Sequence, residues 1–209
     1  MNIDMNAELG AASRSLGRGV RDGVEVHVLT IERHYREPAD EVWSAITQRE
    51  RIGRWLAPVE GDLQLGGTFQ IEGNAGGTVL ACEPTHTFSV SWEYGGHVSY
   101  VDVTLEPTDD GTLLRLVHSA PSAPDHWERF GPGAVGIGWE LALMGLGLHL
   151  ADPAAELPGP EQLPDLTPFM TAAGQAWGEA TIAADYDPEW ARAAAGRCIA
   201  FYTGAPAEG

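Results

Sequence analysis

The chain has 209 residues, a hydrophobic fraction of 44% and a formal net charge of −18. This length suits one domain with an extension, and the hydrophobic fraction is sufficient for a buried core. All twelve basic residues are arginines against thirty acids, a balance that disfavours nucleic acid and anionic membranes as partners. No unbroken apolar run approaches the ~18 residues of a membrane span, and residues 1–10 do not form a secretory signal.

The two cysteines, Cys82 and Cys198, lie far apart and form no CxxC pair. We interpret them as reduced thiols of an intracellular chain. Together with the missing signal and apolar run, they lead us to expect a cytoplasmic protein that does not insert into membranes.

The N-terminal part of the chain begins without a clear pattern. Residues 1–22 have no clear period, and we expect a leader without regular structure. A long first strand is predicted over residues 24–36, because its apolar residues alternate, although imperfectly. A helix is predicted over residues 38–46, because proline at its entry and acids in its first turn favour a helix start. A second short helix is expected over residues 49–55.

Short strands separated by tight turns fill the middle of the chain. Glycine and asparagine tolerate positive φ, so residues 73–77 and the pair Gly95–Gly96 are strong hairpin turns. This spacing predicts an antiparallel sheet of about six strands. After the first strand, the expected strands cover residues 68–72, 78–83, 87–94, 97–106 and 112–119.

The C-terminal part of the chain reads as helical. A loop over residues 120–133 precedes a helix over 134–150, which contains four glycines and so depends on packing. Its apolar stripe consists of Val135, Trp139, Ala142, Leu143, Leu146 and Leu150. A linker at 152–167 leads to two more helices, over 168–185 and 188–202.

This order of elements predicts an α+β fold of the helix-grip type. A curved antiparallel sheet grips the long helix, because that helix must bury its apolar stripe on the sheet. We divide the chain into a leader (1–22), a helix-grip domain (23–151) and a linker with a two-helix C-terminal extension (152–209).

Residues 27–150 contain a series of short motifs whose order and spacing together are specific. The motifs are Pro38 with Glu41-Val42-Trp43, Arg54-Trp55, Gly61-Asp62-Leu63, Gly66-Gly67 with Phe69, Glu83-Pro84, Ser91-Trp92-Glu93, Gly111-Thr112 with Leu114-Leu116-His118, and Gly138-Trp139. Together they resemble the Bet v 1/START-like (SRPBCC) superfamily, in particular its branch of bacterial proteins like the activator of Hsp90 ATPase homologue 1 (AHSA1-like).

The resemblance implies a cavity between the sheet and the long helix that can hold an apolar small molecule. It does not imply one activity, since the superfamily includes lipid carriers, hormone receptors and aromatase/cyclases. The eukaryotic co-chaperones of this branch carry an additional N-terminal domain, for which the sequence has no room, so we do not expect Hsp90 activation.

Residues that alternate onto one face of three strands are the candidate lining of this cavity. They are Phe88, Val90, Trp92 and Tyr94 on one strand, Phe69 and Ile71 on a second, and Leu114, Leu116 and His118 on a third. The competing interpretation is that the same side chains simply fill the core. The predicted ligand-binding residues are Trp55, Phe69, Ile71, Phe88, Trp92, Tyr94, Leu116, His118, Trp139 and Leu143.

His118 and Tyr94 are the candidate catalytic residues. A buried neutral imidazole could orient a ligand or exchange a proton, and a tyrosine hydroxyl could donate a hydrogen bond. The alternative for His118 is a core histidine bonded to a backbone group or water. We expect no metal and no cofactor, because the histidines have no ligand spacing and the chain lacks a phosphate-loop lysine and a nucleophile elbow.

Three functions are consistent with these residues. The first is binding of an apolar small molecule. The second is a cyclase or dehydratase that folds a hydrophobic intermediate without metal or covalent nucleophile. The third is a protein-interaction or stress-related, co-chaperone-like module. A homodimer is compatible with each of them.

Overall fold

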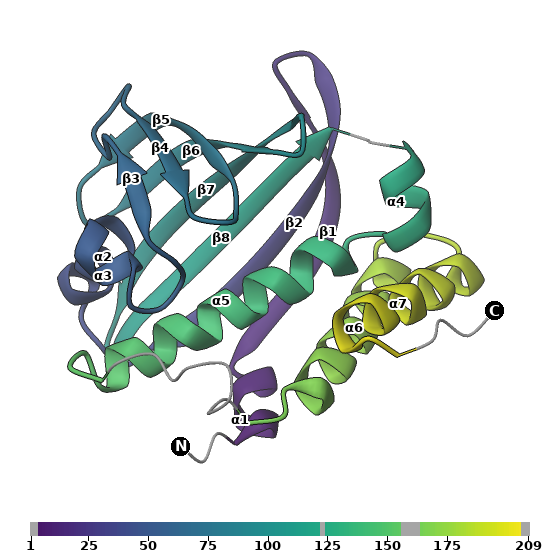
Figure 1. Cartoon of the computed structure of the whole chain (residues 1–209). Helices are drawn as coiled ribbons and strands as arrows, with labels where there is room; N and C mark the ends of the chain where they lie inside the picture. The colour runs from purple at the N-terminus through teal and green to yellow at the C-terminus, as the bar shows by residue number, and fades with distance from the viewer. Residues whose placement is uncertain (1–3, 122–123, 156–163, 206–209) are drawn as a thin grey trace. The chain divides into compact units, whose positions relative to one another are not determined.

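The computed structural model describes residues 4–121, 124–155 and 164–205 of the chain (Figure 1). Residues 156–163 of the expected linker and residues 122–123 of the expected loop lie outside them. The helices are α1 (Met5–Gly10), α2 (Ala39–Thr47), α3 (Arg49–Ile52), α4 (Pro124–Phe130), α5 (Gly133–Ala151), α6 (Thr167–Ala183) and α7 (Pro188–Thr203). The strands are β1 (Ala12–Arg21), β2 (Val24–Tyr35), β3 (Val59–Gly61), β4 (Thr68–Ile71), β5 (Gly76–Glu83), β6 (Thr87–Tyr94), β7 (His97–Thr108) and β8 (Gly111–Pro121).

The strands form one sheet in the order β1-β2-β8-β7-β6-β5-β4-β3. All the pairs from β3 to β8 are antiparallel neighbours. The predicted α+β class, the five predicted middle strands and the three predicted long helices are therefore confirmed.

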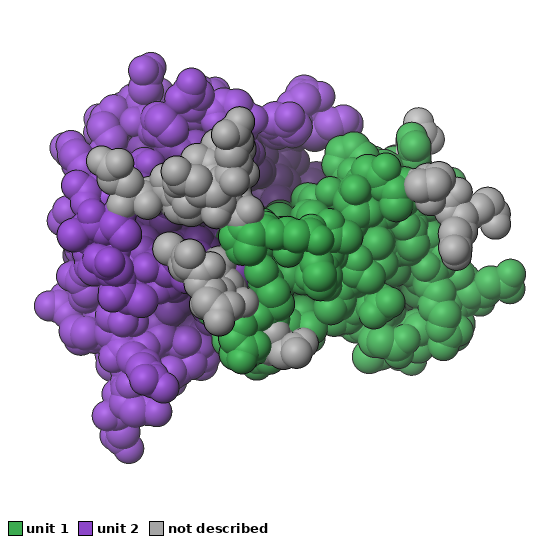
Figure 2. Space-filling model, turned by 60° about the horizontal axis from the view of Figure 1, so that its bottom comes forward, with its two compact units in different colours: residues 1–31, 122–141, 158–209 green, residues 32–121, 142–157 purple. Residues whose placement is uncertain are grey.

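The chain divides into two compact units, each discontinuous in sequence (Figure 2). Unit 1 comprises residues 1–31, 122–141 and 158–209, and unit 2 comprises residues 32–121 and 142–157. The predicted division of the chain into residues 1–22, 23–151 and 152–209 stays a prediction.

In unit 2, helix α2 begins where the sequence predicts it. Pro38 is the N-cap, its carbonyl accepts hydrogen bonds from the backbone of Glu41 and Val42, and Asp40 and Glu41 occupy the first turn. These acids lie at the positive end of the helix dipole, where a carboxylate is stabilising. Val42 is fully buried, so the predicted apolar face of this helix packs inward.

In unit 1, helices α6 and α7 pack side by side through small residues. The indole of Trp177 on α6 is 1% exposed and lies against Gly136, where any side chain would collide with it. Asp187 caps α7 by accepting a hydrogen bond from the backbone N–H of Trp190. The aromatic residues of α7 are not all buried, because Phe201 remains 70% exposed.

Four elements differ from the sequence-based expectations. The expected leader contains helix α1 and strand β1, and the expected loop contains helix α4, so both expectations are wrong there. Strand β3 was not expected. Strand β1 is rich in serine, glycine and arginine and buries little besides Leu16, so its backbone pairing in the sheet, rather than its residue propensity, makes it a strand.

Helix α5 also differs from its prediction, because it is apolar on all sides rather than along one stripe. Ile137, outside the expected stripe, is fully buried. By length and composition α5 could cross a membrane. However, it carries the buried Glu140, whose carboxylate receives two 2.7 Å hydrogen bonds from Arg14 within unit 1. It is therefore a core helix.

We predict that Gly61→Ala destabilises the protein far more than Gly66→Ala. Both glycines have positive φ, 102° and 81°, which costs a side chain about 1 kcal/mol. At Gly61 a Cβ would also collide with the backbone of Thr68 and Phe69, whereas at Gly66 it meets nothing within 4 Å. In denaturant unfolding, we expect Gly61→Ala to lower the free energy of unfolding by about 3 kcal/mol or more, and Gly66→Ala to lower it by about 1 kcal/mol. Equal losses would contradict the close approach of β3 to β4.

Candidate functional site

The register of β6, β7 and β8 in unit 2 brings apolar side chains onto one face of the sheet. Residues directly opposite each other in antiparallel strands point to the same side. Val90 pairs with Val101 and Val101 with His118, while Phe88 pairs with Val103 and Val103 with Leu116. We define the apolar face as Phe88, Val90, Trp92, Ser99, Val101, Val103, Leu105, Leu114, Leu116 and His118. The sequence prediction that Phe88, Val90 and Trp92 share one side is confirmed, as it is for Leu114, Leu116 and His118.

Two polar side chains interrupt the apolar face. The His118 ring, 5% exposed, lies with Nε2 2.9 Å from the Ser99 hydroxyl. Ser99 in turn donates a hydrogen bond of 3.0 Å to the backbone carbonyl of Trp92. The three residues come from three adjacent strands, so the sheet itself fixes the position of the imidazole.

Burial lowers the pKa of His118 to about 4. The charged imidazolium is disfavoured because it would lose its hydration among apolar neighbours. His118 is therefore neutral at pH 7, and its predicted burial on the apolar strand face is confirmed.

A small apolar cluster lies at the Trp92 end of the apolar face. Its buried residues are Ile52, Val59 and Ile71, and Phe69 and Trp92 pack against it while remaining partly exposed. Phe69 lies opposite Gly77 on β5, where a side chain would collide with the backbone of Ser91 on β6. The predicted residues Phe69, Ile71 and Trp92 are thus brought together.

Other predicted residues of unit 2 are held by helices. The Phe88 ring meets the Trp43 ring of α2 edge-on, with centroids 6.0 Å apart. The indole N–H of Trp55 donates a 3.0 Å hydrogen bond to the Ala45 carbonyl. The carbonyl of Leu143, on the second half of α5, accepts a 2.9 Å hydrogen bond from the Tyr35 hydroxyl.

Two predicted residues are placed apart from this group. Tyr94 lies where β6 turns into β7 and is 62% exposed. Trp139 belongs to unit 1 and is half-buried. The Tyr94 hydroxyl could donate a hydrogen bond only near the hairpin. Of the two candidate catalytic residues, His118 is thus the buried one.

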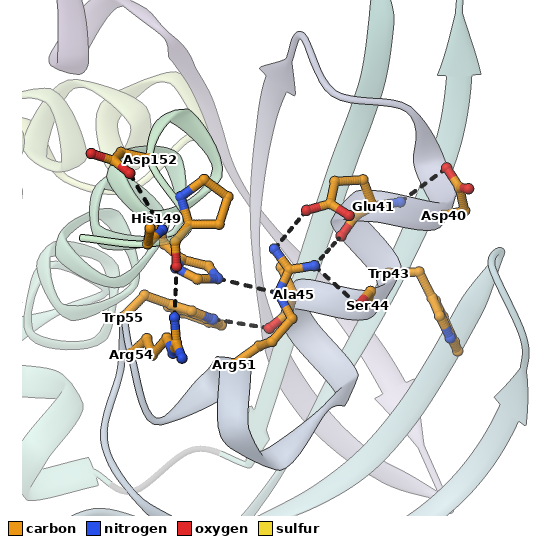
Figure 3. Close-up of polar contacts among 12 residues, drawn as sticks. Asp40, Glu41, Trp43, Ser44, Ala45, Arg51, Arg54, Trp55, His149 and Asp152 are labelled. Atoms are coloured by element: carbon orange, nitrogen blue, oxygen red, sulfur yellow. Dashed lines mark hydrogen bonds and ion pairs between the residues drawn. The ribbon is translucent and has the colours of Figure 1, made fainter. Parts of the chain in front are cut away.

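A polar cluster around Arg51 in unit 2 was not predicted (Figure 3). Its guanidinium donates to Oε1 of Glu41 at 2.7 Å, to Ser44 at 3.0 Å and to Nε2 of His149 at 3.2 Å. The hydrogen bond from Arg51 lowers the pKa of Glu41, and burial together with the charges of Arg51 and Arg54 lowers that of His149. Residues 41, 51 and 149 are too far apart in sequence for a spacing argument to join them.

Unit 1 contains a second unpredicted cluster, built of aromatic rings. His27 stacks on Trp127 with ring centroids 3.5 Å apart, and Tyr186 and Trp190 complete the group. The Tyr186 hydroxyl lies 3.0 Å from both Nδ1 of His27 and Nε of Arg18. These rings contact one another directly, so the cluster joins β1, β2, α4 and α7 rather than enclosing a ligand.

A hollow in unit 1 and the buried thiol there offer no site. The hollow between Phe130, Trp177 and Ala194 leaves no room for a molecule the size of water. The Cys198 thiol donates to the Phe130 carbonyl, and burial raises its pKa to about 12. A thiol with such a pKa is not a nucleophile at pH 7.

We predict that His118 makes stability fall as the pH drops from about 6.5 to 4. In this range the unfolded chain binds a proton at its histidine, whereas the folded chain, with a pKa of about 4, does not. The wild type should lose up to about 3 kcal/mol more than His118→Gln over this interval. Denaturant unfolding at several pH values gives the free energy of unfolding of both proteins as a function of pH. If the two curves run parallel between pH 6.5 and 4, the burial of a neutral His118 ring is contradicted.

We predict that Arg51→Lys lowers the free energy of unfolding by about 1–2 kcal/mol, because an ammonium cannot reach Glu41, Ser44 and His149 together. Arg115→Lys is the matched control. Its guanidinium is exposed and 3.7 Å from Glu32, so we expect a change within about 0.5 kcal/mol. Urea unfolding measures both, and similar small losses would show that the Arg51 cluster contributes no stability.

Comparison with solved structures shows the same architecture elsewhere. CalU16 from Micromonospora echinospora, solved by crystallography, is 36% identical with a TM-score of 0.68, and the match covers 82% of this chain and 99% of CalU16. MLL2253 from Mesorhizobium loti is 28% identical over 61% of this chain and 98% of its own, with a TM-score of 0.53. The match to the Aha1 dimer from Colwellia psychrerythraea covers 61% of this chain and 98% of that chain. At 15% identity and a TM-score of 0.51, it shows a shared fold alone.

A comparison with curated proteins found no match. Residues 36–151, more than half of the chain, match the family model described as Activator of Hsp90 ATPase homolog 1-like protein. The predicted helix-grip fold and the predicted resemblance are both confirmed. The chain therefore belongs to the AHSA1-like family of the Bet v 1-like, helix-grip superfamily.

Proposed function

We propose that the chain binds an apolar small molecule on the apolar face of unit 2. The observation that carries the proposal is the combination of incompletely buried rings, Phe69, Phe88 and Trp92, with one polar pair, the buried His118 and the half-buried Ser99. Ligand sites are mostly apolar and contain a few polar groups that fix orientation. A face that served only as core would be expected to bury its rings completely and to avoid an imidazole.

The chemistry of His118 favours binding over catalysis. A general base works best when its pKa lies near the working pH, and a ring with a pKa of about 4 is a weak base at pH 7. In a cyclase or dehydratase, His118 would thus orient the intermediate rather than remove its proton. The interaction module and the homodimer stay alternatives, and the dimer of the Colwellia protein is a property of that protein.

The proposal is tested by titration with N-phenyl-1-naphthylamine, a neutral probe whose fluorescence rises in apolar surroundings. A neutral probe is needed because a net charge of −18 repels anionic dyes. We expect saturable binding with one site per chain, and an affinity at least about fivefold weaker in Trp92→Ala, which removes a large apolar contact.

Val98→Ala is the control variant. Val98 pairs with Glu93 on the opposite side of the same strands and is 47% exposed, so its removal should leave the affinity unchanged. Thermal unfolding of both variants confirms that they remain folded. No saturable signal, or equal weakening by both substitutions, would refute binding on the apolar face.

A further inference from the structure

Residues 49–57 of unit 2, which contain α3 and the turn after it, pack at one end of the apolar face. Ile52 belongs to the buried apolar cluster, and Leu56 and Ala57 of the same segment pack against that cluster. Trp92 of the apolar face packs against it too and remains partly exposed. A movement of residues 49–57 would therefore open the Trp92 end of the apolar face.

Three arginines of this segment tie it to its neighbours. Arg49 donates to two backbone carbonyls of β3, and Arg54 donates to the Pro153 carbonyl just after α5 at 2.7 Å. Carbonyl acceptors do not titrate. Arg51 donates to side chains of α2 and, at 3.2 Å, to Nε2 of His149 on α5 (Figure 3). This last contact depends on pH, because a protonated imidazole has no lone pair left to accept a hydrogen bond.

The contact between Arg51 and His149 requires a neutral ring. Arginine can only donate, so Nε2 of His149 accepts and the ring proton lies on Nδ1. This Nδ1 atom is buried, and no hydrogen-bond partner for it lies within the described parts of the chain. A buried N–H without an acceptor destabilises the arrangement that buries it. The closed position of the segment thus carries a cost that exposure of His149 to water would remove.

We propose that the hydrogen bond from Arg51 to His149 is a pH-sensitive latch, and that protonation of His149 releases residues 49–57 from α5 and lets a ligand leave the apolar face. This inference rests on the proposed function and adds a mode of regulation to the same site. A proton on Nε2 would set one N–H against another and place a second positive charge 3.2 Å from the guanidinium nitrogen. Arg51 would keep its partners Glu41 and Ser44 on α2, so the separation occurs between α3 and α5.

The charged groups around His149 agree with this direction. Burial is the largest cause of its lowered pKa, followed by the charges of Arg51 and Arg54, whereas Glu41 on α2 acts in the opposite sense. Asp152, just after α5, accepts a hydrogen bond from a backbone N–H. In the open arrangement the ring is hydrated and its pKa returns towards 6.5, so below this pH the open form binds more protons than the closed form. A falling pH therefore favours opening.

Amide hydrogen exchange of residues 51–56 tests the latch without a ligand. After correction for the intrinsic effect of pH, the protection of these amides should fall at least about threefold in the wild type between pH 7.5 and 5.5. His149→Gln should keep its protection, because the glutamine carbonyl accepts from Arg51 and does not titrate. His97→Gln is the matched control, since it removes an exposed histidine of unit 2, and it should behave like the wild type. His118, with a pKa of about 4, stays neutral over this range.

Stopped-flow release of bound N-phenyl-1-naphthylamine on dilution tests the effect on a ligand. The probe is uncharged at both pH values, so a change in its release rate reports the protein. We expect release about fivefold faster at pH 5.5 than at pH 7.5 in the wild type and in His97→Gln, and equal rates in His149→Gln. Thermal unfolding at both pH values confirms that the variants are folded.

The possible outcomes separate the inference from the proposed function. Constant protection in the wild type, or an equal loss of protection in His149→Gln, overturns the latch and leaves apolar binding intact. Protection that falls without a change in the release rate overturns the control of the ligand. If the probe does not bind, the proposed function fails and the regulation of a ligand fails with it, while hydrogen exchange still shows whether residues 49–57 open.

Discussion

The backbone register of β6, β7 and β8 is the constraint on which the candidate site depends. Side chains of a strand alternate between two sides, so a shift of one residue in β7 would move Val101, Val103 and Ser99 to the other side of the sheet. The observed register instead stacks Val90, Val101 and His118 in one row. It also aligns Trp92 with Ser99, and this pairing lets the serine connect the histidine to a backbone carbonyl. The position of the His118 ring therefore follows from strand pairing.

Several buried polar side chains in the described residues, among them Glu140 and His118, are tied to specific partners that influence what the group can do. Arg14 holds Glu140 with two hydrogen bonds inside unit 1, which compensates for the cost of a carboxylate that is 2% exposed. Arg51 lowers the pKa of Glu41 through a hydrogen bond, and burial followed by the charges of Arg51 and Arg54 lowers the pKa of His149 inside unit 2. At His118, which contacts the Ser99 hydroxyl, burial lowers the pKa to about 4.

Helix α5 illustrates how packing overrides local preference. Its glycines are unfavourable for a helix, but two of them allow contacts that any side chain would block. At Gly136 the Trp177 indole occupies the space of a side chain in unit 1, and at Gly145 the Trp55 carbonyl does so in unit 2. The buried residues of α5, such as Ile137, Leu143 and Met144, follow the helical period, but apolar residues also occupy half-buried positions between them, so the apolar pattern of the sequence did not single out the buried stripe.

The sequence alone was sufficient to predict the strands and turns of the middle of the chain, the entries of α2 and α7, the helix-grip class and the shared side of Phe88, Val90 and Trp92. These features depend on residues close in sequence: glycines at turns, prolines at helix starts, and a period of two along a strand. Tertiary structure alone decided that the polar segment of β1 joins the sheet, that Tyr94 ends up exposed, and that Glu41 and Arg51 meet His149. Those outcomes depend on partners separated by up to about a hundred residues, and no local pattern records which distant segments the folded chain brings together.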